Sequence, residues 1–262
     1  MNQFRTALWA ERRKFFRSKV TLFSALGMSI APLVGGLFMV ILKDPEAARS
    51  MGLISIKAQI AVGTADWTAL FNMLAQAVAI GGGIVFAIIA IWVFGREFSD
   101  RTVKDLLALP TSREAIVAAK LVVVAVWSIL LTLWVFALGL VVGALVEIPG
   151  WSADLMWVSF ADIAGASLLT IILLPFVALA ASLGRGYLLP FGWTVLTIVL
   201  AQIAAFTGWG EYFPWAIPAL FSGAAGPRAD WLGPHSYLII AAACLTGLGL
   251  TFWWWRSADQ AG

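Results

Sequence analysis

The chain contains little charge and few of the side chains that bind metal ions or form disulfides. Charged residues make up 12% of its 262 residues, about half the share usual in soluble domains. It has one histidine and one cysteine, Cys244, so no intrachain disulfide can form and no His/Cys ligand set is present. The phosphate-loop motif GxxxxGK[ST] is also missing. We therefore expect no catalytic, cofactor-binding or metal-binding residues in this chain.

Long apolar runs take the place of the missing charge. Hydrophobic residues make up 61% of the chain, and its charge-poor stretches are long enough to cross a hydrocarbon core about 30 Å thick as helices. We expect an all-α polytopic membrane protein that forms one domain over residues 1–262. Its six predicted spans cover about 20–42, 68–94, 115–146, 155–182, 188–207 and 236–255.

Basic residues are unevenly divided between the two sides of this predicted bundle. Of the 17 Lys and Arg residues, 13 lie in the N-terminal segment, the stretch 94–120, the short turn at Arg185 and the C-terminal end. Short loops rich in Lys and Arg mark the cytoplasmic side, so both termini are predicted to be cytoplasmic. Residues 3–18 alternate aromatic and basic side chains, which is typical of a helix lying in the membrane interface.

The loop 95–114 lies within the most highly charged stretch, "FGREFSDRTVKDLLALPTSREAIVAAK". Asp100 is four residues before Lys104, and Arg101 is four before Asp105, a spacing that supports a short helix. Ser99 is a plausible N-cap for it.

One face of this short helix is apolar, and a new helix begins after it. The apolar positions are Val103, Leu106, Leu107 and Pro110, and the proline is expected to end the helix. Thr111 and Glu114 then fit a capping box at the start of the third span. Such an amphipathic helix could rest on lipid or dock into a groove on a soluble partner.

The loop resembles the signature loop of type-2 ATP-binding-cassette permeases, the membrane subunits of many bacterial exporters. The matching residues are Arg96, Glu97, Phe98, Thr102, Leu106, Leu107, Pro110 and Lys120. "WAERRKFFRSK" is similar to the family's N-terminal elbow helix, and residues 211–223 resemble its re-entrant outer segment between the fifth and sixth spans. The nearest resemblance is to bacitracin- and lantibiotic-resistance permeases.

The resemblance implies that the loop helix is a coupling helix inserted into a separate ATPase subunit, with a second contact near Arg185 and Tyr187. The implied coupling residues are Asp100, Arg101, Val103, Lys104, Leu106, Leu107, Pro110 and Arg185. Arg96 and Glu97 would lie at an inner gate, where Glu97 is expected to form an exposed ion pair with an arginine of the elbow or of a neighbouring subunit.

The resemblance also implies partners and a location. Two ATPase copies would carry ATP and Mg²⁺, and a second permease, identical or different, would complete a dimer in the plasma membrane of a prokaryote. Membrane lipids are further expected partners, and nucleic acid is not.

Polar side chains within the spans are sparse. Asn72 and Gln76 in the second span and Gln202 in the fifth are the candidates for a translocation path. Walls of this kind favour an amphipathic peptide, a drug or a lipid-linked cargo over a hydrated ion, which needs charged rings. The glycine run 81–83 in the second span allows a close helix contact or a kink.

Two other readings of the chain remain open at this point. An intramembrane serine protease would pair Ser167 with His235, and the two side chains would have to lie within hydrogen-bonding distance. A non-transporting membrane scaffold or immunity protein would act by binding alone and would need no ATPase.

Overall fold

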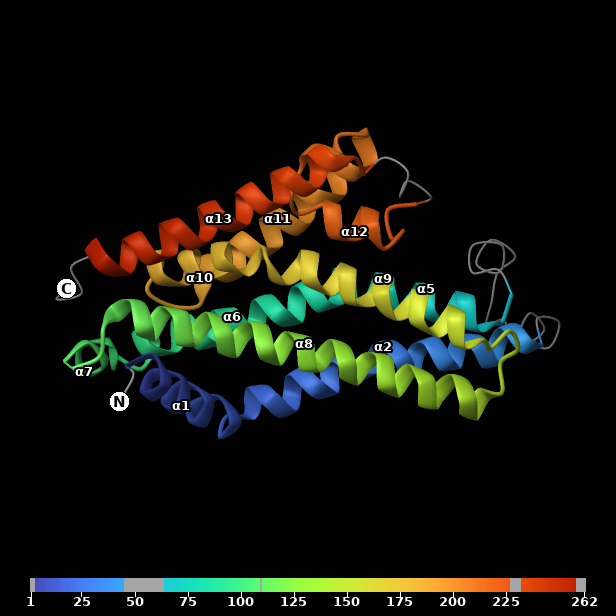
Figure 1. Cartoon of the computed structure of the whole chain (residues 1–262), viewed down its shortest axis with the longest axis horizontal. Coiled ribbons are helices and arrows are strands. Elements are labelled where there is room, and N and C mark those ends of the chain that lie inside the picture. The colour runs from blue at the N-terminus through green and yellow to red at the C-terminus, as the bar shows by residue number, and fades with distance from the viewer. Residues whose placement is uncertain (1–2, 45–63, 109, 227–231, 258–262) are drawn as a thin grey trace.

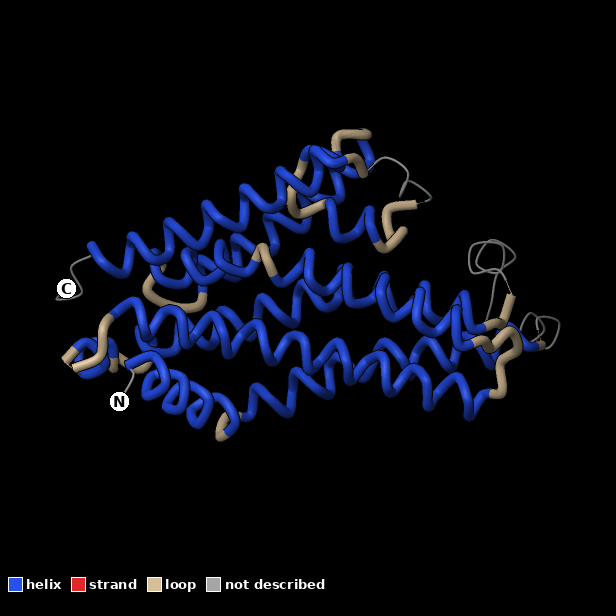
Figure 2. The backbone as a smooth tube through the Cα atoms, viewed as in Figure 1, coloured by secondary structure: helices blue, strands red, loops and turns tan. Residues whose placement is uncertain are grey.

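A computed structural model describes residues 3–44, 64–108, 110–226 and 232–257, and these are helix, turn or loop throughout. Six of the described helical segments are long and apolar enough to cross a membrane, as the sequence predicts. They form an elongated bundle whose connections gather at two ends (Figures 1 and 2). The protein is therefore an all-α polytopic membrane protein.

The first half of the bundle is built around one long helix. α1 (Gln3–Phe16) and α2 (Lys19–Lys43) both pack on α8 (Arg113–Val146). α8 has 34 residues, which corresponds to about 51 Å of helix, so it extends beyond a hydrocarbon core of about 30 Å.

The second span is a composite of three helical segments. α5 (Trp67–Ala77) begins at Asp66, whose side chain accepts a hydrogen bond from the Ala69 backbone N–H. It continues as the π-helical turn η1 (Val78–Gly82) and then as α6 (Gly83–Ser99). The predicted glycine run thus lies at a π-turn. α6 runs to Ser99, five residues past the predicted end of the span, and Lys14 of α1 pairs with Glu97 in its last part.

The other half of the bundle contains a broken span and two simple ones. α9 (Ala153–Ile171) stops two residues before α10 (Leu174–Leu183), where Pro175 lacks the N–H that a continuous helix would use. α10 packs against α6 and against α13 (Pro234–Ser257), and α11 (Leu188–Thr207) follows it. Thr251 of α13 donates a hydrogen bond to the Pro175 carbonyl in the first turn of α10 (3.1 Å).

Two short elements connect α11 to α13. They are the 3-10 turn η2 (Gly210–Tyr212) and α12 (Ile217–Phe221), which packs against α9. Ile217 and Leu220 are buried there. Prolines at 214 and 218 keep this segment from continuing either neighbouring helix. Its re-entry into the membrane stays a prediction.

The segments that carry most of the charge lie at one end of the bundle. α1, the end of α13 and the short helix α7 (Val103–Leu107) are all found there (Figure 1). At this end Arg113 donates to the carbonyl oxygens of Trp255 and Arg256, while Arg256 Nε lies 2.7 Å from Glu114 Oε1. Basic side chains satisfy the last carbonyls of a helix well.

Candidate functional site: a buried charge cluster beside the coupling loop

Four charged side chains from three helices meet at this end of the bundle. α1 contributes Glu11 and Lys14, α6 contributes Glu97, and α8 contributes Lys120. We call these four residues the charge cluster. Lys120 is 0% exposed, Glu97 4% and Glu11 6%. The cluster is electrically neutral in sum, which is what makes it tolerable in an apolar surrounding.

Lys120 is the centre of the cluster. Its Nζ lies 3.0 Å from Glu11 Oε2, 3.3 Å from Glu97 Oε1 and 2.9 Å from the Val93 carbonyl oxygen. A lysine ammonium has three donors, so each can be satisfied within the protein. One side chain of α8 thus holds α1 and α6 together.

Lys14 is the most exposed member of the cluster. Its Nζ lies 2.8 Å from Glu97 Oε1 and 3.3 Å from Glu11 Oε1. Burial lowers the pKa of Lys14, but the attraction of Glu11 and Glu97 outweighs it, and the net pKa is raised. Lys14 therefore stays protonated at neutral pH.

The predicted partner of Glu97 was wrong in two respects. The α1 residue that binds it is Lys14, and the pair is part-buried, because Glu97 is buried while 35% of the Lys14 side chain is exposed. Positions 11, 14 and 15 share one face of α1, whereas Arg12 and Arg13 are exposed, and Arg13 packs over the Trp9 ring at 5.3 Å.

Thr102 connects Glu97 of the cluster to α7, within the predicted coupling loop 95–114. Its Oγ1 donates to Glu97 Oε2 (2.8 Å), and its backbone N–H donates to the Glu97 carbonyl (2.9 Å). Thr102 immediately precedes α7, so the start of α7 is hydrogen-bonded to the carboxylate that binds both lysines.

The capping and pairing predicted for the loop helix need correction. α7 has five residues and follows Thr102, not Ser99, because Arg101 adopts a left-handed backbone (φ 58°) that interrupts the helix. Asp100 pairs with Arg96, one turn back on α6 (3.1 Å), in place of Lys104. The helix also ends at Leu107, before Pro110.

The predicted apolar face of the loop helix turns partly into the protein. Val103 and Leu106 are 7% and 8% exposed, so both pack against the bundle, while Pro110 is exposed. Arg101, Lys104, Asp105 and Ala108 are also exposed there.

The turn between α10 and α11 touches the same region. A Cβ added to Gly95 of α6 would lie 2.7 Å from Tyr187 Cδ1 and 2.9 Å from the Gly186 carbonyl oxygen. Burial raises the pKa of the Tyr187 phenol, and a hydrogen bond with Ser99 acts in the opposite direction. Arg185 lies exposed in this turn with a left-handed backbone (φ 47°). The two predicted coupling segments are therefore neighbours.

The start of α8 also differs from the prediction in one detail. Ser112 is the N-cap, and its Oγ accepts the Ala115 backbone N–H (3.3 Å). Thr111 lies one residue too early, since α8 begins at Arg113, and Glu114 pairs with Arg256 instead of closing a capping box.

The predicted path residues do not form one continuous wall in the structure. Gln202 lines a cavity of about 80 Å³ between α6, α10, α11 and α12, beside Thr194 and Thr197. Asn72 and Gln76 are not among its lining residues, and Asn72 is exposed on α5.

Ser167 and His235 each have other hydrogen-bond partners, which argues against the serine protease. Ser167 Oγ shares a hydrogen bond with Thr132 Oγ1 (2.7 Å). His235 Nε2 lies 3.1 Å from Glu211 Oε2, and its ring stacks on Tyr212. Within the described residues the two side chains make no hydrogen bond to each other, which a catalytic dyad requires.

Sequence reasoning missed Glu11 and Lys14 as members of the site. A signal was present, because Glu11 is the one acidic residue before Asp44, in a segment rich in arginine and lysine. A carboxylate on such a helix needs a cation as partner if it is buried, and Lys120 within an apolar run was a candidate.

Comparisons with known proteins fit this arrangement. The family described as ABC-2 family transporter protein matches residues 7–201. A bacitracin transport permease protein of Bacillus licheniformis is 26% identical over 177 residues, which cover 67% of this chain and 84% of that protein. The family match includes the whole charge cluster and the coupling loop. The chain belongs to the ABC-2 family of transporter proteins.

Proposed function

We propose that this permease is the membrane subunit of an ATP-driven exporter whose ATP is hydrolysed by a separate subunit. The observation that carries the proposal is the hydrogen bond from Thr102 to Glu97. Through it the base of α7 is connected to α1, α6 and α8 at once. A force applied to α7 by a nucleotide-driven partner would reach three helices without crossing a flexible segment.

The proposed docking surface differs from the apolar face expected from the sequence. α7 and the turn at Arg185 present Arg101, Lys104 and Asp105 at the same end of the bundle. Charged rims of this kind set the register and specificity of a protein interface more than its affinity. The face bearing Val103 and Leu106 instead holds α7 on the permease.

The experiment is co-purification with an ATP-binding-cassette ATPase encoded beside this chain. Reversing both charges, Lys104→Glu with Asp105→Lys, should abolish co-purification while the permease still elutes as a folded protein. The matched control is Leu106→Ala, which loosens α7 without changing the docking charges. Undiminished co-purification of the charge-reversed variant would contradict this docking surface.

We further propose a two-fold assembly with α7 and both termini in the cytoplasm. Support comes from the distribution of basic residues and from the common end shared by α1, α7 and α13. Two permeases and two ATPases would form the working unit, with ATP and Mg²⁺ bound by the ATPases.

The proposed cargo is an amphipathic antimicrobial peptide or drug, or the lipid-linked molecule that such a peptide binds. The B. licheniformis relative is named for bacitracin transport. The cavity at Gln202 has hydroxyl and amide groups on apolar walls and no charged residue among those that line it, which suits such a cargo better than an ion. Deleting the gene should lower the minimal inhibitory concentration of bacitracin-like peptides, and restoring it with its ATPase should raise it again. An unchanged value for every such peptide would refute the cargo class but not the subunit role.

A further inference from the structure

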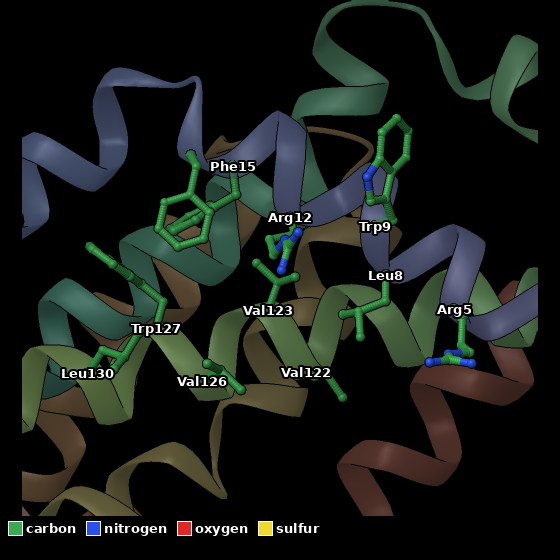
Figure 3. A pocket seen from close by; sticks show the side chains of 11 residues that line it. Arg5, Leu8, Trp9, Arg12, Phe15, Val122, Val123, Val126, Trp127 and Leu130 are labelled. Atoms are coloured by element: carbon green, nitrogen blue, oxygen red, sulfur yellow. The ribbon is translucent and has the colours of Figure 1, made fainter.

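A second, larger cavity lies between α1 and α8. Its volume is about 430 Å³, within the usual size range of sites for small organic ligands. Figure 3 shows side chains of the two helices around it. Its walls are mainly apolar and aromatic, from Leu8, Trp9, Phe16, Val126, Trp127 and Leu130.

Two arginines complete this cavity. Arg5 and Arg12 both line it from α1, and both are exposed (Figure 3). They are seven residues apart, and therefore lie on one face of the helix with Leu8 and Trp9. Among the described residues neither arginine has a carboxylate partner within ion-pair distance, because Glu11 is turned into the charge cluster and its two oxygens bind lysines.

We expect the arginine side of the cavity to lie near a membrane surface, because it is beside the first half of α8. The first ten residues of α8 precede Val123, and this helix is too long to fit within the hydrocarbon core alone. The arginines would accordingly meet headgroups, while Val126 and Leu130 face acyl chains.

We propose that this cavity binds one anionic phospholipid of the surrounding membrane. Arg5 and Arg12 would bind the phosphate, and an acyl chain would run along Val126 and Leu130. Basic pockets between membrane helices take anionic lipid headgroups for this electrostatic reason.

A second copy of the permease fits this surface less well. A two-fold contact places the same patch on both sides. No acidic residue lines the cavity, so two copies would bring arginines together without counter-charges. A phospholipid supplies both the negative charge and the apolar chain.

Native mass spectrometry of the purified full chain tests the proposal. The protein is released from nanodiscs of equal parts phosphatidylglycerol and phosphatidylcholine, and retained lipids are counted. We expect one phosphatidylglycerol to be retained in preference. Arg5→Gln with Arg12→Gln should weaken that binding by roughly 30-fold, the value expected for two basic contacts with an anionic lipid.

The matched control removes two other exposed charges near the same end, Arg17→Gln with Lys19→Gln, which do not line the cavity. It should retain phosphatidylglycerol as the unaltered protein does. Equal loss in both double variants, or equal retention of the two lipids by the unaltered protein, would refute a specific site. Excess inorganic phosphate should not displace the lipid, and displacement would refute the acyl-chain contribution.

A second pair of variants tests the apolar wall. Val126→Trp fills the cavity, whereas Val141→Trp places the same ring on an equally exposed position of α8, with 50% and 53% of the two valines exposed. Only Val126→Trp should reduce retention of phosphatidylglycerol. A change of oligomeric state with unchanged lipid binding would instead identify the face as a contact between copies and overturn the proposal.

Discussion

Lys120 Nζ lies 3.0 Å from Glu11 Oε2, although 109 residues separate the two in the chain. This contact fixes α1 to the third span from inside the protein. α1 is thus held by a buried ion pair, and a shift of either helix would change the position of the other.

Replacing Lys120 should destabilise the fold strongly. In Lys120→Met two buried carboxylates would share Lys14 alone, and breaking a buried ion pair costs about 3–5 kcal/mol. Thermal unfolding in detergent measures the loss. The control, Lys104→Met, removes an exposed lysine and should change stability by no more than about 0.5 kcal/mol. Similar unfolding temperatures for the two variants would show that the cluster contributes little.

Removing the Thr102 hydroxyl should affect coupling more than folding. Thr102→Val keeps the shape of the side chain but leaves Glu97 Oε2 without its donor, a loss of about 1.5–3 kcal/mol for a bond to a charged group. We expect the partner ATPase to bind and hydrolyse ATP without matching transport. Thr102→Ser restores the hydroxyl and should restore coupling, and failure of this rescue would contradict the role of the hydrogen bond.

Adding a methyl group to Gly95 should separate the two turns that meet there. In Gly95→Ala the new Cβ would lie 2.7 Å from Tyr187 Cδ1, and overpacking of this kind costs about 1–3 kcal/mol. Gly192→Ala is the control, since no atom lies within 4 Å of its added Cβ. Transport and thermal stability should fall in the first variant only.

The proposed topology can be checked by cysteine labelling in a Cys244→Ala background. Ala153→Cys, at the exposed start of α9, should react with a membrane-impermeant thiol reagent added to intact cells. Ala108→Cys, just after α7, should react only after the cells are opened. The reverse pattern would place α7 and both termini outside.

The spans could be predicted from the sequence because a membrane segment is recognised by length and lack of charge alone. The details at the charged end could not. Pairing at i,i+4 predicted Asp100 with Lys104, but the left-handed Arg101 breaks the helix between them. Spacing along one segment carries no information about a partner such as Glu11, which comes from another part of the chain. The expected roles of the coupling and path residues stay predictions.

The π-turn at Val78–Gly82 determines which residue of α6 enters the charge cluster. Seven turns of an α-helix contain about 25 residues. An α-helix without a π-turn would therefore place residue 96 on the same buried face as Phe71. A π-turn adds about one residue, so this buried face reaches Glu97 instead. Glu97 is accordingly buried. Without that extra residue Arg96 would face Lys14 and Lys120, and three like charges would meet where the structure has a neutral cluster. The π-turn in the glycine-rich middle of the span, about five turns before Glu97, thus determines whether an acidic or a basic residue of α6 faces the charge cluster.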